Sequence, residues 1–136
     1  DTIIFGCQFR GAADDHPPLV GIHRRGEQPV LLAAPDKVQS ALVNYVGSVS
    51  ADSAGEIVAA SAPKGGLITY WDVASRRYLG SSELKDGCGV APTRHAAGFL
   101  LTSGGGSLVE ANVRDLAALE RHDSAFEWDN HAILVR

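Results

Sequence analysis

The sequence contains no methionine, only two cysteines and few aromatic residues. Because a natural translation product begins with methionine, we expect a stretch that begins at Asp1 to be a processed protein or, as we favour, a piece of a longer one. No apolar run approaches the ~20 residues that a membrane-spanning helix needs. The first residues also lack the pattern of a secretory signal.

A surplus of charge of either sign is missing as well. Twelve Lys and Arg stand against sixteen Asp and Glu, for a net charge of −4, and the basic residues are scattered rather than clustered. Nucleic-acid binding needs a basic patch, so the composition argues against a nucleic-acid partner. With 45% hydrophobic residues among 136, the chain can bury a core. We therefore predict a folded protein segment without a membrane span.

The two cysteines, Cys7 and Cys88, lie far apart in the sequence. A free cysteine packs like a small hydrophobic residue, which is the simplest interpretation of both. A disulfide between them is the alternative, and spacing alone cannot establish the geometry that it needs. Thiol chemistry would require a lowered pKa and a nearby base, neither of which the sequence reveals.

The most informative pattern is a unit that recurs about every 40 residues, a period typical of repeat architectures. One period separates Val49 from Val90, and nearly the same interval separates Ile57 from Phe99. Around these positions, short apolar runs alternate with turns rich in Gly, Pro, Asp and Ser. A repeat of this length built from short strands is typical of a β-propeller blade of the WD40-like or YVTN-like kind.

We therefore predict an all-β fold, an incomplete β-propeller with about two full four-stranded blades, two partial blades and one short helix between blades. The blades fall within one propeller segment, residues 1–136, at residues 1–35 (partial), 45–84, 87–124 and 128–136 (partial). The helix is predicted over Asp36–Val43, and Trp128–Val135 should begin another inner strand. Residues 115–124 of the third unit should form the outer strand, although residues 115–120 could equally begin as a helical turn.

The repeat also predicts where a site should lie. In a four-stranded meander, the turn between the second and third strands lies at the same end as the link that enters the first strand. These segments form the rim of the central channel, where binding residues on loops gather. The candidate binding residues on this rim are Arg10, His16, Asn44, Tyr45, Lys64, Cys88, Asp129, Asn130 and His131. The pattern assigns no catalytic residue and no cofactor, and it leaves a metal site open.

Three motifs need an interpretation of their own. His131 could be a ligand or proton carrier at the channel mouth, or a histidine that is hydrogen-bonded from blade to blade. The run Asp14-Asp15-His16 could hold a metal ion, but neighbouring loop residues seldom converge on one ion, which favours an exposed polar turn. The dipeptide Trp71-Asp72 should place an aromatic ring between blades and an aspartate that caps the next turn.

Several segments together resemble one bacterial family, the domain-of-unknown-function 1513 family, over essentially the whole chain. They are Pro17–Gly26, Asn44–Val49, Cys88–Pro92, Gly98–Gly104 and Trp128–His131. The resemblance implies the C-terminal half or third of an exported, periplasmic, seven-bladed propeller. Members tend to be encoded beside imelysin-type iron-regulated proteins and dihaem cytochrome-like oxidoreductases, which implies an envelope protein as partner. The family has no established catalytic residue to carry over.

These observations lead to a binding or scaffold module of the cell envelope, linked through the resemblance to iron uptake. The alternative is a metal-binding or redox accessory enzyme with a site at the channel mouth, built from His131, Asp129 and Cys88. A lactonase-like hydrolase shares the fold and rests on that analogy alone. The unremarkable catalytic inventory favours the binding module over an enzyme.

Overall fold

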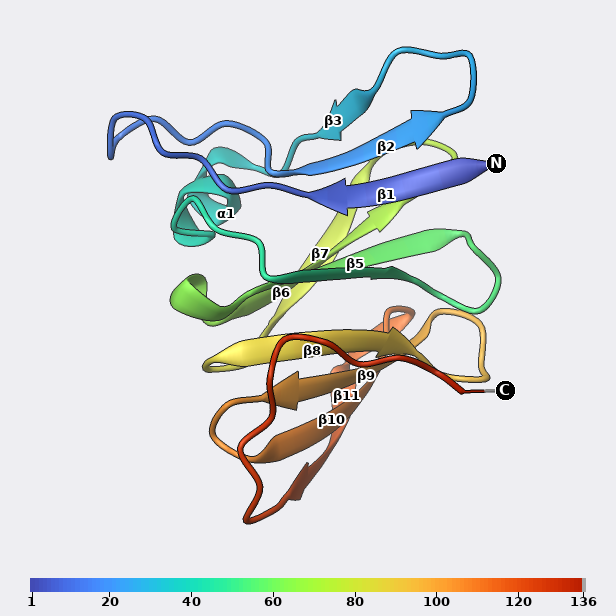
Figure 1. The fold of residues 1–136 in the computed structure, drawn as a ribbon. Coiled ribbons are helices and arrows are strands. Elements are labelled where there is room, and N and C mark those ends of the chain that lie inside the picture. The colour runs from blue at the N-terminus through green and yellow to red at the C-terminus, as the bar shows by residue number, and fades with distance from the viewer. Residues whose placement is uncertain (136) are drawn as a thin grey trace.

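Three antiparallel sheets follow one another along the chain in the computed structural model, which describes residues 1–135 (Figure 1). The first sheet contains β1 (Thr2–Gly6), β2 (Val20–Arg24) and β3 (Val30–Leu32). The second contains β4 (Ser48–Ala51), β5 (Ile57–Ala62), β6 (Leu67–Asp72) and β7 (Tyr78–Glu83). The third contains β8 (Gly87–Pro92), β9 (Gly98–Ser103), β10 (Ser107–Asn112) and β11 (Asp115–Asp123). Each sheet pairs its strands in sequence order, which confirms the predicted incomplete propeller.

Two short helical segments connect the strands. The helix α1 (Asp36–Ala41) lies between the first two sheets, and the 3-10 turn η1 (Pro63–Gly65) joins β5 to β6. The predicted inter-blade helix is confirmed, but it ends earlier than expected because Val43 and Asn44 adopt left-handed φ values of 52° and 53°. No helix in residues 1–135 is long and apolar enough to cross a membrane.

The sequence left open whether residues 115–120 form a strand or a helical turn, and in the structure they belong to the strand β11. β11 pairs with β10 in antiparallel register, and a bulge lies between Glu110 and Asn112. Inter-strand pairing therefore prevails over the local helical tendency of residues 115–120, because the ladder satisfies backbone groups along the edge of β10.

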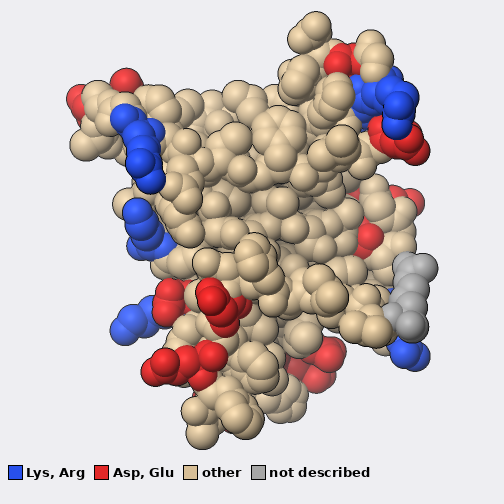
Figure 2. Space-filling model, in the orientation of Figure 1, with Lys and Arg blue, Asp and Glu red and all other residues tan. Residues whose placement is uncertain are grey.

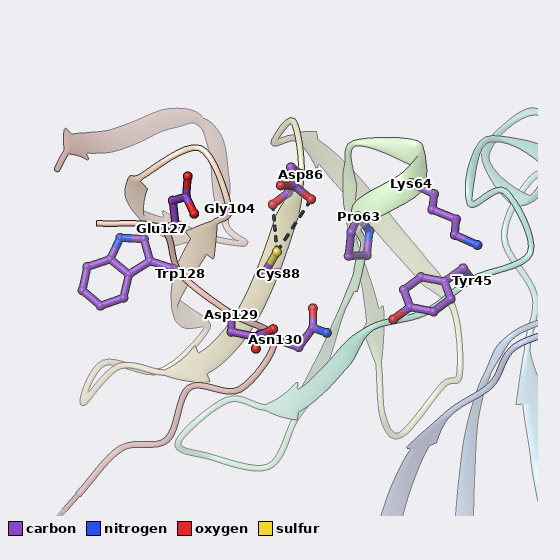
Figure 3. Close-up of a pocket in the computed structure, with 10 residues that line it drawn as sticks. All are labelled: Tyr45, Pro63, Lys64, Asp86, Cys88, Gly104, Glu127, Trp128, Asp129 and Asn130. Atoms are coloured by element: carbon purple, nitrogen blue, oxygen red, sulfur yellow. Dashed lines mark hydrogen bonds between the residues drawn. The ribbon is translucent and has the colours of Figure 1, made fainter. Parts of the chain in front are cut away.

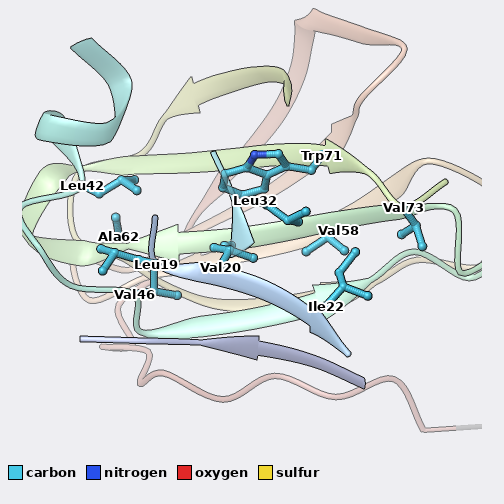
Figure 4. Packing of buried hydrophobic residues seen from close by; sticks show 11 residues of the cluster. Leu19, Val20, Ile22, Leu32, Leu42, Val46, Val58, Ala62, Trp71 and Val73 are labelled. Carbon is cyan, nitrogen blue, oxygen red and sulfur yellow. The ribbon is translucent and has the colours of Figure 1, made fainter. Parts of the chain in front are cut away.

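The middle sheet is buried on both faces, which explains why its hydrophobic alternation is weak in the sequence. On β5, Val58 and Ala60 belong to the core shared with the first sheet, whereas Ala59 belongs to the core shared with the third. On β6, Trp71 faces the first core and Tyr70 the second. Figure 4 shows the first core, in which the Trp71 indole lies among aliphatic side chains from both sheets.

Polar contacts also join neighbouring sheets. The Trp71 indole Nε1 donates to the carbonyl oxygen of Ala33 at 3.2 Å, and the Ser61 hydroxyl donates to the carbonyl oxygen of Cys88 at 2.7 Å. Both bonds are directional and lie at contacts between sheets, so they fix the orientation of one sheet against the next. Packing and hydrogen bonding together make the sheets one arc.

The predicted roles of Trp71 and Asp72 are confirmed. Trp71 is fully buried between sheets, and an oxygen of the Asp72 carboxylate accepts hydrogen bonds from both the backbone N–H and the hydroxyl of Ser75, each at 2.6 Å. The bonds from Ser75 hold the pKa of Asp72 below its ordinary value. This dipeptide therefore has a structural role in the blade.

The predicted inner strand over Trp128–Val135 is wrong. The segment forms no strand and runs beside the inner edge of β8, where Gly89 leaves room for Ala132 (Figure 1). Its predicted blade would need a second strand to pair with, and no such strand lies in the described residues, so its backbone gains no ladder. Two of its apolar side chains are left exposed, with Ile133 83% and Val135 77% accessible.

Charged side chains avoid the centre of the face formed by the inner edges of the sheets. Figure 2 shows Lys, Arg, Asp and Glu atoms gathered along the two lateral edges of this face, with uncharged atoms between them. The hollow along β4, β8 and the last residues is lined mostly by small and apolar residues, including Ser48, Val90 and Ala132. On this face, the charged side chains therefore lie along the two edges.

Candidate functional site

The predicted rim segments lie on one edge of the arc. The β1–β2 loop, η1, the β7–β8 link and the β9–β10 turn all occupy the left edge in Figure 1, where α1 also lies. This follows from the meander, because successive antiparallel strands return the chain to the same edge at every second connection. The meander thus brings these connections to one edge of the arc.

A cavity of about 700 Å³ opens on this edge at the seam between the second and third sheets (Figure 3). Its lining residues are Tyr45, Pro63, Lys64, Asp86, Cys88, Gly104, Glu127, Trp128, Asp129 and Asn130. We name this space the seam cavity. Five of the nine predicted residues therefore line one space, although they come from segments far apart in the sequence. Whether they bind a ligand stays a prediction.

The other four predicted residues do not line this cavity. Arg10 and His16 are exposed on the β1–β2 loop, and Asn44 anchors that loop by donating from its Nδ2 to the carbonyl oxygen of Asp15 at 2.9 Å. His131 is exposed and borders separate hollows beside β4. Within residues 1–135 its side chain makes no hydrogen bond, so the blade-to-blade bond considered for it is not formed.

Asp86 and Glu127 were missed by sequence reasoning, yet the repeat itself contains the signal for them. Tyr45, Asp86 and Glu127 follow one another at a constant interval, one repeat apart, and all line the seam cavity. Cys88 lies two residues after Asp86, and Asp129 lies two residues after Glu127, so this second pair is separated by the same interval. The cavity is therefore built from equivalent positions of successive units, where an aromatic ring in one unit is replaced by a carboxylate in the units that follow.

The floor of the cavity is the buried thiol of Cys88. Its Sγ donates to the carbonyl oxygen of Asp86 at 3.1 Å, and an oxygen of the Asp86 carboxylate lies 3.8 Å away. Burial raises the pKa of Cys88, and the negative charges of Asp86 and Asp129 raise it further, against a lowering by the backbone N–H of Gly104. The thiol is therefore held protonated, which is the opposite of an activated nucleophile.

The charges of the cavity are divided between its two ends. At one end the Lys64 ammonium lies 4.9 Å from the centre of the Tyr45 ring. At the other end Asp86, Glu127 and Asp129 carry three carboxylates, none of which forms a salt bridge within residues 1–135. The carboxylate end thus has negative charge that no basic side chain of the described chain compensates.

Metal and disulfide chemistry find little support in this geometry. No group of three or more His, Cys, Asp or Glu side chains in the described residues is arranged to hold a metal ion. The run Asp14-Asp15-His16 is an exposed turn, closed by the bond from the Asp15 N–H to the carbonyl oxygen of Ala12. Cys7 and Cys88 are both free, so the disulfide alternative is wrong.

The rim is held against α1 by a close approach at Gly65. A Cβ atom at this position would overlap the carbonyl oxygen of Ala41 and push η1, with Lys64, away from the helix. We expect Gly65→Ala to lower the free energy of unfolding by about 1–3 kcal/mol, as overpacking does. Gly105→Ala is the control: it meets no atom closer than 3.7 Å and should change stability by less than about 0.5 kcal/mol. Urea denaturation measures both, and equal values would contradict the proposed clash.

The described arc resembles parts of solved propellers. It matches the Cps50 (Swd1) β-propeller domain of Myceliophteria thermophila at 14% identity with a TM-score of 0.56, covering 66% of this chain and 29% of that one. A chain of a mitotic checkpoint complex matches at 18% identity and a TM-score of 0.61, covering 79% and 32%. The WD40 repeats of RRP9 match at 16% and 0.61, covering 79% and 33%. At these identities the likeness shows the fold alone.

Two further comparisons complete this placement. The chain spans about a third of the length of the solved propellers that it matches. No curated protein matches it. The family described as protein of unknown function (DUF1513) matches residues 1–135, and the chain belongs to that family.

Proposed function

We propose that this chain is part of a binding platform of the cell envelope, whose rim presents the seam cavity to a protein partner. The observation that carries the proposal is the cavity itself, because equivalent positions of successive repeats supply Tyr45, Asp86 and Glu127 to one space. A protonated, buried thiol and the absence of a three-ligand metal group in the described residues favour binding over catalysis.

The envelope location and the class of partner are further parts of the proposal and rest on the family resemblance. An imelysin-type or cytochrome-like envelope protein is the partner that the resemblance suggests, and it would connect the platform to iron uptake. One of the matched propellers was solved within a mitotic checkpoint complex, which agrees with a propeller acting by association. Repeat scaffolds present extended rims that suit such contacts.

Affinity capture with the intact protein tests the proposal. Tyr45→Ala combined with Asp86→Ala should reduce recovery of a specific envelope protein at least about tenfold, because both changes alter the cavity wall. The matched control is Arg94→Ala combined with His95→Ala, two exposed changes on the opposite edge, and it should leave recovery unchanged. Equal recovery by all three proteins would refute a role for this rim.

A further inference from the structure

We propose that the seam cavity receives a cationic side chain, an arginine or a lysine, from the protein partner. This inference deepens the proposed function and rests on it. The cavity lies at the seam of two sheets, so its walls come from separate blades and are held by the inter-sheet contacts described above. Such a concave site with a few converging polar groups is suited to one projecting side chain.

The positions of the carboxylates favour a positive charge. Figure 3 shows Asp86 on one side of the Cys88 sulfur and the Asp129 and Asn130 side chains on the other, around a space bordered by Pro63. The negative charges of Asp86 and Asp129 both raise the pKa of the Cys88 thiol, which lies between them. No basic side chain in residues 1–135 neutralises them. A cation that enters this space would meet two carboxylates and an amide oxygen.

At the opposite end of the cavity, the Lys64 ammonium group already lies against an aromatic ring. Lys64 Nζ lies 4.9 Å from the Tyr45 ring centre, an arrangement in which an aromatic face holds a cation. The same cavity therefore combines an aromatic wall with carboxylates, the two features that proteins use to bind guanidinium and ammonium groups. Arginine should bind better than lysine, because its planar guanidinium group presents several N–H donors in a fork that matches the geometry of a carboxylate.

A bare metal ion fits these residues less well. A divalent cation with oxygen ligands takes six or more of them, and the described residues contain no group of three His, Cys, Asp or Glu side chains placed to share one ion. Arginine needs only two or three acceptors in a plane. The geometry therefore selects a side-chain cation, and metal binding becomes an outcome of the test.

An NMR titration of the intact protein tests this inference. The probe is a blocked pentapeptide with a central arginine between serine and glycine residues, compared with the same peptide carrying citrulline, which keeps the shape and removes the charge. We expect the arginine peptide to shift the backbone signals of Cys88 and Asn130 and to bind at least about fivefold more tightly than the citrulline peptide. The preference should shrink as salt is raised from about 50 to about 500 mM.

Charge-neutralising variants identify the groups responsible. Asp86→Asn combined with Asp129→Asn keeps the shape of the cavity and should weaken the arginine peptide about tenfold, whereas Asp115→Asn, an exposed carboxylate on β11, should not. Equal binding of the arginine and citrulline peptides would overturn the inference. So would calcium chloride alone if it produced the same shifts at lower concentration.

The outcomes also separate this inference from the proposed function. If cavity variants reduce partner capture while the arginine peptide does not bind, the binding platform stands and the cationic ligand is wrong. If the arginine peptide binds but the cavity variants leave partner capture unchanged, the cavity binds cations and has no role in partner binding. If neither assay responds to the cavity variants, both proposals fall.

Discussion

Trp71→Ala is expected to lower the free energy of unfolding by about 3–5 kcal/mol, the range typical of large aromatic residues removed from a core. Trp71 is fully buried in the first core, packs edge-on against Tyr78 with ring centres 6.0 Å apart, and bonds Ala33 across the seam. The change therefore removes apolar contact on both sides of the seam and leaves the Ala33 carbonyl oxygen without this donor. Urea denaturation followed by circular dichroism measures it.

Two further variants separate packing from hydrogen bonding at this position. Trp71→Phe keeps most of the ring and loses the indole N–H, so it should cost less than the alanine variant, about 1–3 kcal/mol. Leu79→Ala removes an apolar side chain that is 43% exposed on β7 and should cost less than about 1 kcal/mol. If Trp71→Ala were no more costly than Leu79→Ala, the seam between the first two sheets would not depend on the indole.

The architecture could be predicted from the sequence because the same pattern of strands and turns occurs in more than one repeat. Val49 and Val90 both fall in inner strands, and the turns that follow them close with matching bonds, from Asp52 N–H to Ile57 and from Thr93 N–H to Gly98. Local turn chemistry and strand patterning agree at both places. Such agreement between levels is what makes a sequence predict its fold.

The last residues show where this reasoning fails. Trp128–His131 match the start of an inner strand in spacing, but a strand exists only through its partners. Without a neighbouring strand in the described chain, the apolar side chains of Ile133 and Val135 face solvent and the backbone follows β8 without pairing. Pattern predicts propensity, whereas pairing depends on what else is present.

The candidate site was predicted as a rim and not as a cavity, for a physical reason. The repeat fixes which connections share an edge, and this is enough to bring Tyr45, Lys64 and Cys88 to one place. It does not reveal which of them turn inward at a seam, because this depends on the packing between two sheets. Asp86 illustrates the limit: its left-handed φ of 52° and its contact with the Cys88 sulfur appear only in three dimensions.

Asp52→Ala is the second change expected to have a large effect, about 3–5 kcal/mol of unfolding free energy, because it removes a charged acceptor from three backbone N–H groups, of which the Ala97 N–H is buried. Asp52 is only 5% exposed, and one carboxylate oxygen accepts the backbone N–H groups of Glu56 and Ile57 at 2.8 and 3.1 Å. Its other oxygen accepts the N–H of Ala97 from the next sheet at 2.9 Å. Alanine would leave these three donors without their acceptor, two in the turn and one across the seam, and hydrogen bonds to charged groups contribute about 1.5–3 kcal/mol each without being additive.

Asp72→Ala is the matched comparison, because its carboxylate also caps a turn, but it is partly exposed and stays within one sheet. It should cost about 1 kcal/mol. Equal costs for the two variants would show that the bond from Ala97 to Asp52 adds nothing to the seam. The pair therefore measures how much of the cohesion between the second and third sheets passes through one carboxylate.

The contribution of Asp52 should also depend on pH. Burial raises its pKa, but the backbone N–H groups of Ala97, Ile57 and Glu56 outweigh burial and leave the pKa below the ordinary value for aspartate. The unfolded chain then binds the proton more readily than the folded one. The stabilisation is fully present above the unfolded pKa of about 3.9 and is lost as the pH falls through the lower, folded pKa. Denaturation curves between pH 7 and pH 2.5 should show the gap between the unaltered protein and Asp52→Ala narrowing at the acidic end, and a gap constant over that range would contradict the lowered pKa.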